Sequence, residues 1–110
     1  MAFSATLETK NTAAIITLSG ELDASTASIF KDEVEKAAAK KVQTLVLMMK
    51  DLEYMSSAGL RVLIYTKQKM GVNSDIYVVS PQEMVEETLE KTGFIQSVIV
   101  VRDLAEIEGL

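Results

Sequence analysis

The fold is decided by residues 42–60, VQTLVLMMKDLEYMSSAGL, in which an apolar run leads through a polar segment into an amphipathic pattern. Only two polar residues interrupt the run Val42–Met49, which is typical of a strand covered on both faces. Apolar residues then recur at helical spacing from Leu60 until Gly71, which we expect to end the helix. A buried strand followed by such a helix is the building unit of an α/β domain.

The sequence on either side repeats this alternation of strands and helices. Two β-rich stretches flank the turn Asn11–Thr12 and predict a hairpin, whose second strand we expect Ser19–Gly20 to break. The expected strands are Ala5–Lys10, Ala14–Leu18, Val42–Met49, Asp75–Val79 and Ser97–Val101, and the expected helices run over Ala27–Ala38, from Leu60 to Gly71, from Ser80 to Gly93, and over Asp103–Glu108. Strands that alternate with helices imply right-handed crossovers. The sequence therefore predicts an α/β fold with a mixed, mostly parallel sheet of about five strands and about four helices.

Local signals indicate where the helices start and which side chains they bury. The run Ser80–Glu83 combines a capping-box pair with a proline at the first helical position. Asp23, Ser25 or Thr26 is expected to cap the first helix. The side chains predicted to face the core are Ala27, Phe30, Val34, Ala37 and Ala38 in the first helix, Leu60, Leu63, Ile64 and the stem of Lys67 in the second, and Met84, Val85, Thr88 and Leu89 in the third.

Composition limits the chemistry that the chain can perform. Its 110 residues fit one domain, over residues 1–110, with a core that needs neither disulfides nor a structural metal. It contains no Cys and no His, so Ser-His-Asp and Cys-His catalysis are impossible within it. Carboxylates such as Asp23, Asp51 and Glu53 could form an acid–base pair, but no motif brings them together. We therefore expect a protein that is not an enzyme and that holds no cofactor and no metal.

The charge balance is acidic, with 16 Asp and Glu against 11 Lys and Arg and a net charge of −5. Nucleic-acid binding needs a concentrated basic patch, and anionic membranes repel an acidic surface, so neither is an expected partner. The longest apolar run, Leu45–Met49, is too short to span a bilayer. The first residues lack the basic and apolar regions of a signal peptide. Together with the missing Cys, these features predict a cytoplasmic protein.

The residues that carry chemistry are Ser56-Ser57-Ala58-Gly59, between the buried strand and the second helix. Their position places one or both hydroxyls at a helix N-terminus, beside unpaired backbone N–H groups and the positive end of the helix dipole. Such a site tolerates a phosphate, which adds roughly −1.5 to −2 charges at neutral pH. On spacing alone the simpler interpretation is favoured, in which one serine only caps the helix.

Three segments resemble a known family. The chain is similar to STAS domains, which are shared by anti-sigma factor antagonists and the cytoplasmic tails of sulfate transporters. Leu18–Asp23 resembles the family's segment after its second strand, Asp51–Leu60 its signature loop, and Lys91–Phe94 the segment that closes its third helix. The matches span most of the chain in the expected order. The resemblance thus implies that residues 1–110 form a single STAS domain with the STAS fold.

The resemblance also implies a function. In the family, an unphosphorylated antagonist binds an anti-sigma factor that is also a serine kinase, phosphorylation of one serine in the signature loop releases it, and a phosphatase of the PP2C type restores binding. Alignment on Gly59 places the phosphoacceptor at Ser57. The residues that the resemblance assigns to partner binding are Glu21, Asp23, Ser56, Ser57, Gly59 and Arg61. The expected function is indirect control of sigma-factor-dependent transcription.

Departures from the family pattern leave alternatives open. Many members have an acidic residue before the acceptor and a serine after it, where this chain has Ser56 and Ala58. Ser56 is therefore the alternative acceptor. For Asp23, helix capping and partner contact are equally favoured. Arg61 could contact a partner or a phosphate, but a plain surface role is favoured. Gly59 is expected to permit either close packing or an unusual backbone angle. Two alternative functions also remain: a STAS partner-switch or scaffold module with a non-sigma output, and a STAS domain that binds a small molecule or lipid.

Overall fold

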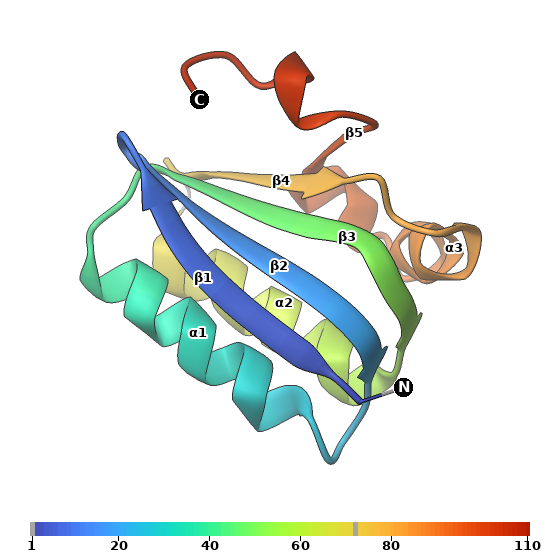
Figure 1. The fold of residues 1–110 in the computed structure, drawn as a ribbon. Coiled ribbons are helices and arrows are strands. Elements are labelled where there is room, and N and C mark those ends of the chain that lie inside the picture. The colour runs from blue at the N-terminus through green and yellow to red at the C-terminus, as the bar shows by residue number, and fades with distance from the viewer. Residues whose placement is uncertain (1, 72) are drawn as a thin grey trace.

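The structure, a computed structural model, describes residues 2–71 and 73–110. Within these ranges the chain forms five strands, three α-helices and two short 3-10 turns (Figure 1). In chain order they are β1 (Ser4–Lys10), β2 (Ala13–Leu22), α1 (Ala27–Ala39), β3 (Thr44–Met55), α2 (Ser57–Met70), β4 (Asp75–Val79), α3 (Glu83–Lys91), η1 (Phe94–Ser97), β5 (Ile99–Val101) and η2 (Leu104–Glu106).

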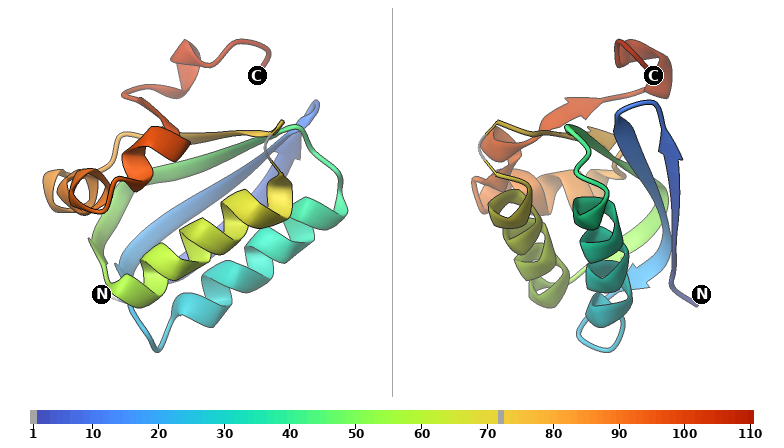
Figure 2. Two further views of the ribbon diagram at one scale, coloured as in Figure 1. Left: turned by 180° about the vertical axis from the view of Figure 1, so that it is seen from behind. Right: turned by 90° about the vertical axis from the view of Figure 1, so that its left-hand side faces the viewer.

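The strands form one sheet in the order β1-β2-β3-β4-β5. β1 is antiparallel to β2, and the other three pairings are parallel. The predicted mixed sheet with an N-terminal hairpin is therefore confirmed. α1 and α2 lie side by side across one face, the C-terminal segment lies over the opposite face, and α3 lies at the end where β3 finishes (Figures 1 and 2).

Alternation along the central strand β3 gives the sheet two apolar faces. Leu45 and Leu47 are fully buried in one cluster with Phe30 of α1 and Leu89 of α3. Val46, between them, belongs to a second cluster on the other face. That second cluster consists of Ile15, Val46, Val79 and Ile107. The central strand is thus covered on both faces, as its nearly continuous apolar run predicts.

The prediction of a fourth helix over Asp103–Glu108 is wrong, because the described chain forms only the single turn η2 there. The Asp103 carboxylate accepts a hydrogen bond from Ala105 N at 2.8 Å, and the Glu106 carboxylate accepts one from Asp103 N at 2.9 Å. These two hydrogen bonds complete a single helical turn. Ile107 then enters the second apolar cluster with only 5% exposure, which ends the turn.

β2 and β3 extend beyond their predicted ends, toward the loop that carries the serines. β2 does not break at Ser19–Gly20 but continues to Leu22 through two register shifts against β3. Gly20 has a φ of +85°, and a Cβ there would collide with the main chain of Ala2. The glycine therefore bends the strand without ending it. β3 continues to Met55, so much of the segment predicted as a loop is strand.

The predicted capping box of α3 does not form. Ser80 lies outside the helix with a φ of +54°, and its N–H donates to the Val101 carbonyl at 2.8 Å. Gln82 occupies the N-cap position, yet its side chain donates to the Lys50 carbonyl at 2.8 Å and caps nothing. Bonds to neighbouring strands therefore decide where this helix begins, and they override the local pattern.

The buried stripe of α2 also differs from the prediction. Its buried residues are Gly59, Val62, Leu63 and Thr66. Ile64, predicted inside, is 40% exposed, and in α3 the same is true of Met84, at 43%. Helical spacing locates a face only to within a residue on either side, and contacts with the sheet then choose the rotation.

Truncation of Ile107 tests whether the C-terminal segment is part of the core. Ile107→Ala is expected to lower the free energy of unfolding by about 2 kcal/mol or more, because it opens a cavity beside Ile15, Val46 and Val79. Ile99→Ala, at a position that is 42% exposed, is the matched control and should change it by only about 0.5 kcal/mol. Urea unfolding measures the free energy of unfolding of both variants. An equal decrease in the two would show that the C-terminal segment contributes no packing to the core.

Candidate functional site

The site lies where β2 and β3 end and α2 begins. Leu22 and Met55 are paired across the two parallel strands. One residue later, Ser56 N donates to the Leu22 carbonyl at 2.8 Å, and the Ser56 carbonyl accepts from Leu60 N at 3.0 Å as the helix starts. The loop is therefore only one residue long, and the sheet fixes the position of the first turn of α2.

The two adjacent serines occupy different environments. Ser56 is the half-buried N-cap of α2, and its Oγ accepts from Ala58 N at 3.2 Å. Ser57 is the first residue of the helix and is exposed. Its hydroxyl makes no hydrogen bond with any residue that the structure describes. The capping role expected for one serine thus belongs to Ser56, while the Ser57 hydroxyl remains open to solvent.

Gly59 is buried at the point where α2 approaches β2 most closely. A Cβ at this position would lie 2.7 Å from Cγ of Leu22 and 3.0 Å from Cγ of Met55. Both neighbours are themselves buried, at 0% and 4% exposure. Gly59 therefore serves close packing, and its position within the first turn of α2 means that no unusual backbone angle is needed.

Arg61 lies one helical turn after Ser57 and is exposed. Residues four apart on a helix share a face, so the guanidinium can reach a group carried by Ser57. Within residues 2–71 and 73–110, Arg61 forms no ion pair. Glu21, on the last part of β2, is exposed and is paired in register with Tyr54.

The carboxylate of Asp23 is held by the turn that leads into α1. Asp23 Oδ1 accepts from Ser25 N at 2.9 Å and from Ser25 Oγ at 2.7 Å. The N-cap of α1 is Thr26, whose hydroxyl donates to the Glu21 carbonyl at 3.0 Å. The side-chain bond from Ser25, then the backbone bond from Ser25, lower the pKa of Asp23 below its ordinary value. Asp23 therefore orders the β2–α1 turn and does not cap the helix itself.

These elements bring most of the predicted site residues to one end of the sheet. Glu21 and Asp23 flank the end of β2, and Ser56 and Ser57 follow the paired end of β3. Gly59 lies beneath this surface and is covered by Leu22 and Met55, so it acts through packing. No group of three or more Asp or Glu side chains in the described ranges is placed to hold a metal ion.

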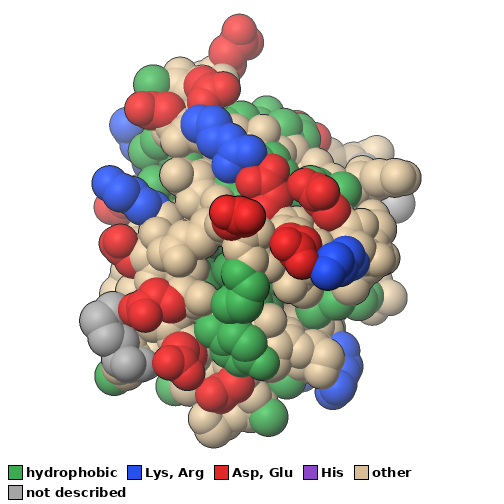
Figure 3. Space-filling model, turned by 90° about the vertical axis from the view of Figure 1, so that its right-hand side faces the viewer, with side chains coloured by type: hydrophobic (Ala, Val, Ile, Leu, Met, Phe, Trp, Pro, Cys, Tyr) green, Lys and Arg blue, Asp and Glu red, His purple; other side chains and the backbone are tan. Residues whose placement is uncertain are grey.

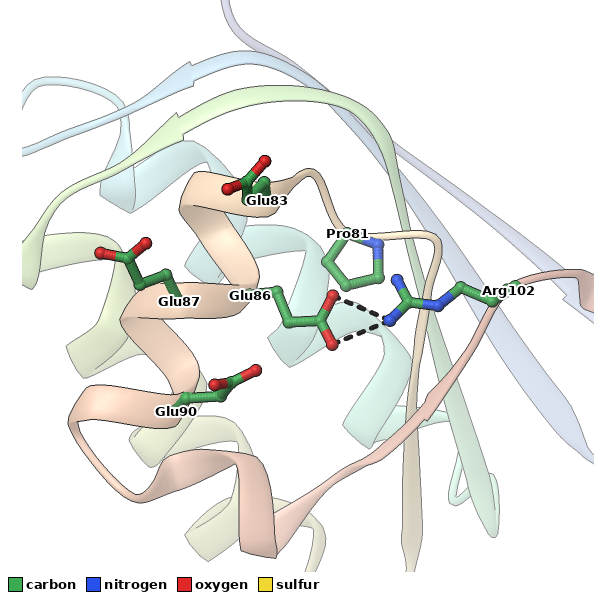
Figure 4. Close-up of a pocket in the computed structure, with 6 residues that line it drawn as sticks. All are labelled: Pro81, Glu83, Glu86, Glu87, Glu90 and Arg102. Carbon is green, nitrogen blue, oxygen red and sulfur yellow. Dashed lines mark hydrogen bonds and ion pairs between the residues drawn. The ribbon is translucent and has the colours of Figure 1, made fainter.

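A second feature, beside α3, was not expected from the sequence. A hollow of 410 Å³ is lined by the six residues drawn in Figure 4, which are Pro81, Glu83, Glu86, Glu87, Glu90 and Arg102. Both carboxylate oxygens of Glu86 accept from one guanidinium nitrogen of Arg102 at 2.9 Å. Helical spacing indicates that the glutamates share a face, but it cannot show that Arg102, from beyond β5, reaches them.

Comparison with known proteins identifies the family. The model of the STAS domain matches residues 4–107. The chain belongs to the STAS domain family. Among curated proteins, the chain is 25% identical over 88 residues to the anti-sigma-F factor antagonist RsfB of Mycobacterium tuberculosis, which covers 80% of this chain and 72% of RsfB.

Solved structures show the same STAS fold. An anti-sigma factor antagonist from Mycobacterium paratuberculosis superposes with a TM-score of 0.87 and 22% identity, covering 96% of this chain and 90% of that one. The anti-sigma factor antagonist SpoIIAA in its unphosphorylated form gives a TM-score of 0.81 and 18% identity, covering 96% and 94% of the two chains. In this STAS domain, none of the described helices is long and apolar enough to cross a membrane.

Enlarging Gly59 tests the close approach of α2 to β2. Gly59→Ala is expected to destabilise the STAS domain by about 1–3 kcal/mol, because the new methyl overlaps Leu22 and Met55. In an exposed helical position the same change would stabilise by up to about 1 kcal/mol. The double variant Gly59→Ala/Leu22→Ala should lose less than the sum of the two single variants, since the second truncation makes room. Strict additivity in urea unfolding would contradict this contact.

Titration tests the turn around Asp23. Carbon-detected NMR should give the Asp23 carboxyl a pKa below its ordinary value, and Ser25→Ala should raise that pKa. Because folding depresses the pKa of Asp23, the ionised carboxylate adds to the free energy of unfolding at pH values above its pKa in the unfolded state. That contribution is lost as the pH falls through its pKa in the folded state. Ser28→Ala, exposed in the next turn, is the control and should leave the pKa unchanged.

Proposed function

We propose that this STAS domain is an anti-sigma factor antagonist that binds an anti-sigma factor with serine kinase activity, and that phosphorylation of Ser57 releases it. The curated relative RsfB is named for antagonism of an anti-sigma-F factor. The observation that carries the proposal for this chain is the exposed Ser57 hydroxyl at the start of α2, in the segment resembling the family's signature loop. The protein is then a substrate of kinase and phosphatase and not an enzyme.

The geometry favours Ser57 over Ser56 as the acceptor. A kinase must reach the hydroxyl from solvent and direct its oxygen at the phosphoryl group. Ser56 Oγ is half-buried and engaged with Ala58 N, so its modification would break the cap of α2. Ser57 needs no such rearrangement, because it is exposed and its hydroxyl makes no hydrogen bond with any described residue.

The mechanism of release is local electrostatics. A phosphate on Ser57 adds roughly −1.5 to −2 charges beside a strand end that already carries Glu21 and Asp23. The N-terminus of α2 and Arg61 stabilise this charge within the free protein. Within a desolvated interface, like charges brought together by the phosphate cost roughly several kcal/mol, enough to dissociate a tight complex. The fold itself need not change.

The consequence for the cell is indirect. Unphosphorylated antagonist sequesters the anti-sigma factor, the sigma factor is then free, and its genes are transcribed. A phosphatase of the PP2C type would return the phosphorylated form to the binding state in the cytoplasm. A neighbouring gene for a sigma factor or for an ATP-binding anti-sigma kinase would separate this output from a non-sigma partner switch.

Mass spectrometry of protein purified from its native cells tests the assignment. Peptide analysis is expected to place one phosphate on Ser57, and Ser57→Ala should abolish it. Ser56→Ala is the matched control and should retain the phosphate while losing helix-cap stability of about 1 kcal/mol. A phosphate on Ser56 would move the switch by one residue. If no phosphate appears during growth, stress or stationary phase, the switch is refuted and the domain is a constitutive binding module.

A further inference from the structure

The surface formed by the last part of β3 and the start of α3 exposes two large apolar side chains. Tyr54, on the last part of β3, is 40% exposed, and Met84, in the first turn of α3, is 43% exposed. The side chain of Gln82 donates to the Lys50 carbonyl at 2.8 Å and so holds the start of α3 against β3. Figure 3 shows hydrophobic side chains at the centre of this face, with Asp and Glu side chains around them.

The carboxylates of this face outnumber its free cations. Those exposed on β3 and α3 are Asp51, Glu53, Glu83, Glu87 and Glu90. Two basic side chains of this region are held by acidic partners: Lys91 contacts Glu87 at 2.7 Å, and Arg102 contacts Glu86 at 2.9 Å. Lys50, at the edge of this stretch, is exposed and forms no ion pair with any residue that the structure describes. The surroundings of the apolar centre are therefore strongly negative.

This arrangement matches the anatomy of a protein interface. Tyr and Met are enriched at the centres of interfaces, where charged residues are depleted, and a polar rim surrounds the centre. Here the rim has a single sign, so it selects a partner of the opposite sign. The surface is also continuous with the serine loop, because Tyr54 precedes the cap Ser56 by two residues on the same strand end.

We propose that Tyr54 and Met84 form the apolar centre of a docking surface for a protein that presents apolar side chains, with Lys and Arg only on the side that faces the carboxylates of α3 and not opposite Ser57. This inference rests on the proposed function, because the occupant is the same anti-sigma kinase that contacts Ser57. The footprint of that partner thus extends from the start of α2 across the end of β3 onto α3. Burial of Tyr54 and Met84 slows dissociation, and the acidic rim accelerates association in a salt-dependent manner.

The two parts of the surface predict different kinetic effects. Tyr54→Ala and Met84→Ala are each expected to weaken the affinity about tenfold, mainly through faster dissociation. Glu83→Lys is expected to slow association and to reduce its dependence on salt. Both apolar side chains are exposed, so their truncation should leave the thermal midpoint of unfolding nearly unchanged, which separates a binding defect from a folding defect.

Biolayer interferometry measures these rates with the anti-sigma-type kinases of the source organism, each purified and presented singly to the unphosphorylated chain. Ile99→Ala is the matched control: it removes a side chain of similar exposure at 42%. Ile99 pairs with Tyr77 of β4, which in turn pairs with Val46 of β3. Val46 lies eight residues before Tyr54, or about 25 Å along the strand, so Ile99 is far from the proposed surface. It should bind like the wild type.

The outcomes separate this inference from the proposed function on which it rests. If the wild type binds a kinase and the Tyr54 and Met84 variants bind it with affinities within about twofold of wild type, the docking surface is refuted and the role of Ser57 stands. If the wild type binds none of these kinases, the proposed function fails and this inference fails with it. The docking surface is supported if the Tyr54 and Met84 variants lose affinity and Glu83→Lys associates more slowly, while Ile99→Ala binds like the wild type.

Discussion

The contact on which the rest of the site depends is that of Gly59 with Leu22. Because a glycine stands in the first turn of α2, the helix backbone approaches the end of β2 so closely that a methyl group would overlap Leu22. The bond from Ser56 N to the Leu22 carbonyl at 2.8 Å reinforces the same junction from the loop. With the base of the turn fixed in this way, Ser57 stands on the outside of a rigid support.

The rigidity of this junction explains how one small modification can act without a change of fold. Protein interiors are close-packed, so a helix locked against a strand does not move in small steps. A phosphate on an exposed residue of that helix therefore changes mainly the charge that a partner meets. In our proposal this added charge is the signal, and it falls beside Glu21 at the start of α2.

Much of this architecture could be predicted from the sequence. The buried strand, the hairpin and the helix ended by Gly71 follow from apolar periodicity and from turn residues, and the structure confirms them. The site residues could be named because Asp51–Leu60 resembles a family signature, whereas spacing alone favoured a simple helix cap. The structure confirms a serine cap, at Ser56, and leaves Ser57 exposed, whereas the role of Ser57 as phosphoacceptor stays a proposal.

What could not be predicted depends on contacts between distant segments. The capping-box pattern of Ser80 was overridden by its bond to Val101, and helical spacing placed Met84 in the core because it cannot resolve neighbouring positions on a face. The short turn after Asp103 formed in place of a helix because Ile107 packs against Ile15, Val46 and Val79 on one face of the sheet. For Ser80 and Ile107, partners far along the chain decided the outcome.

The central claim is that phosphorylation of Ser57 acts locally. Backbone amide chemical shifts of the unphosphorylated and the Ser57-phosphorylated protein test it most directly. Our account predicts shift changes confined to residues 56–61 and to the end of β2 at residues 21–23, with the amides of Leu45 and Leu47 in the centre of the sheet unchanged. Changes that spread through β3 and β4 would contradict it and would indicate a rearrangement of the fold.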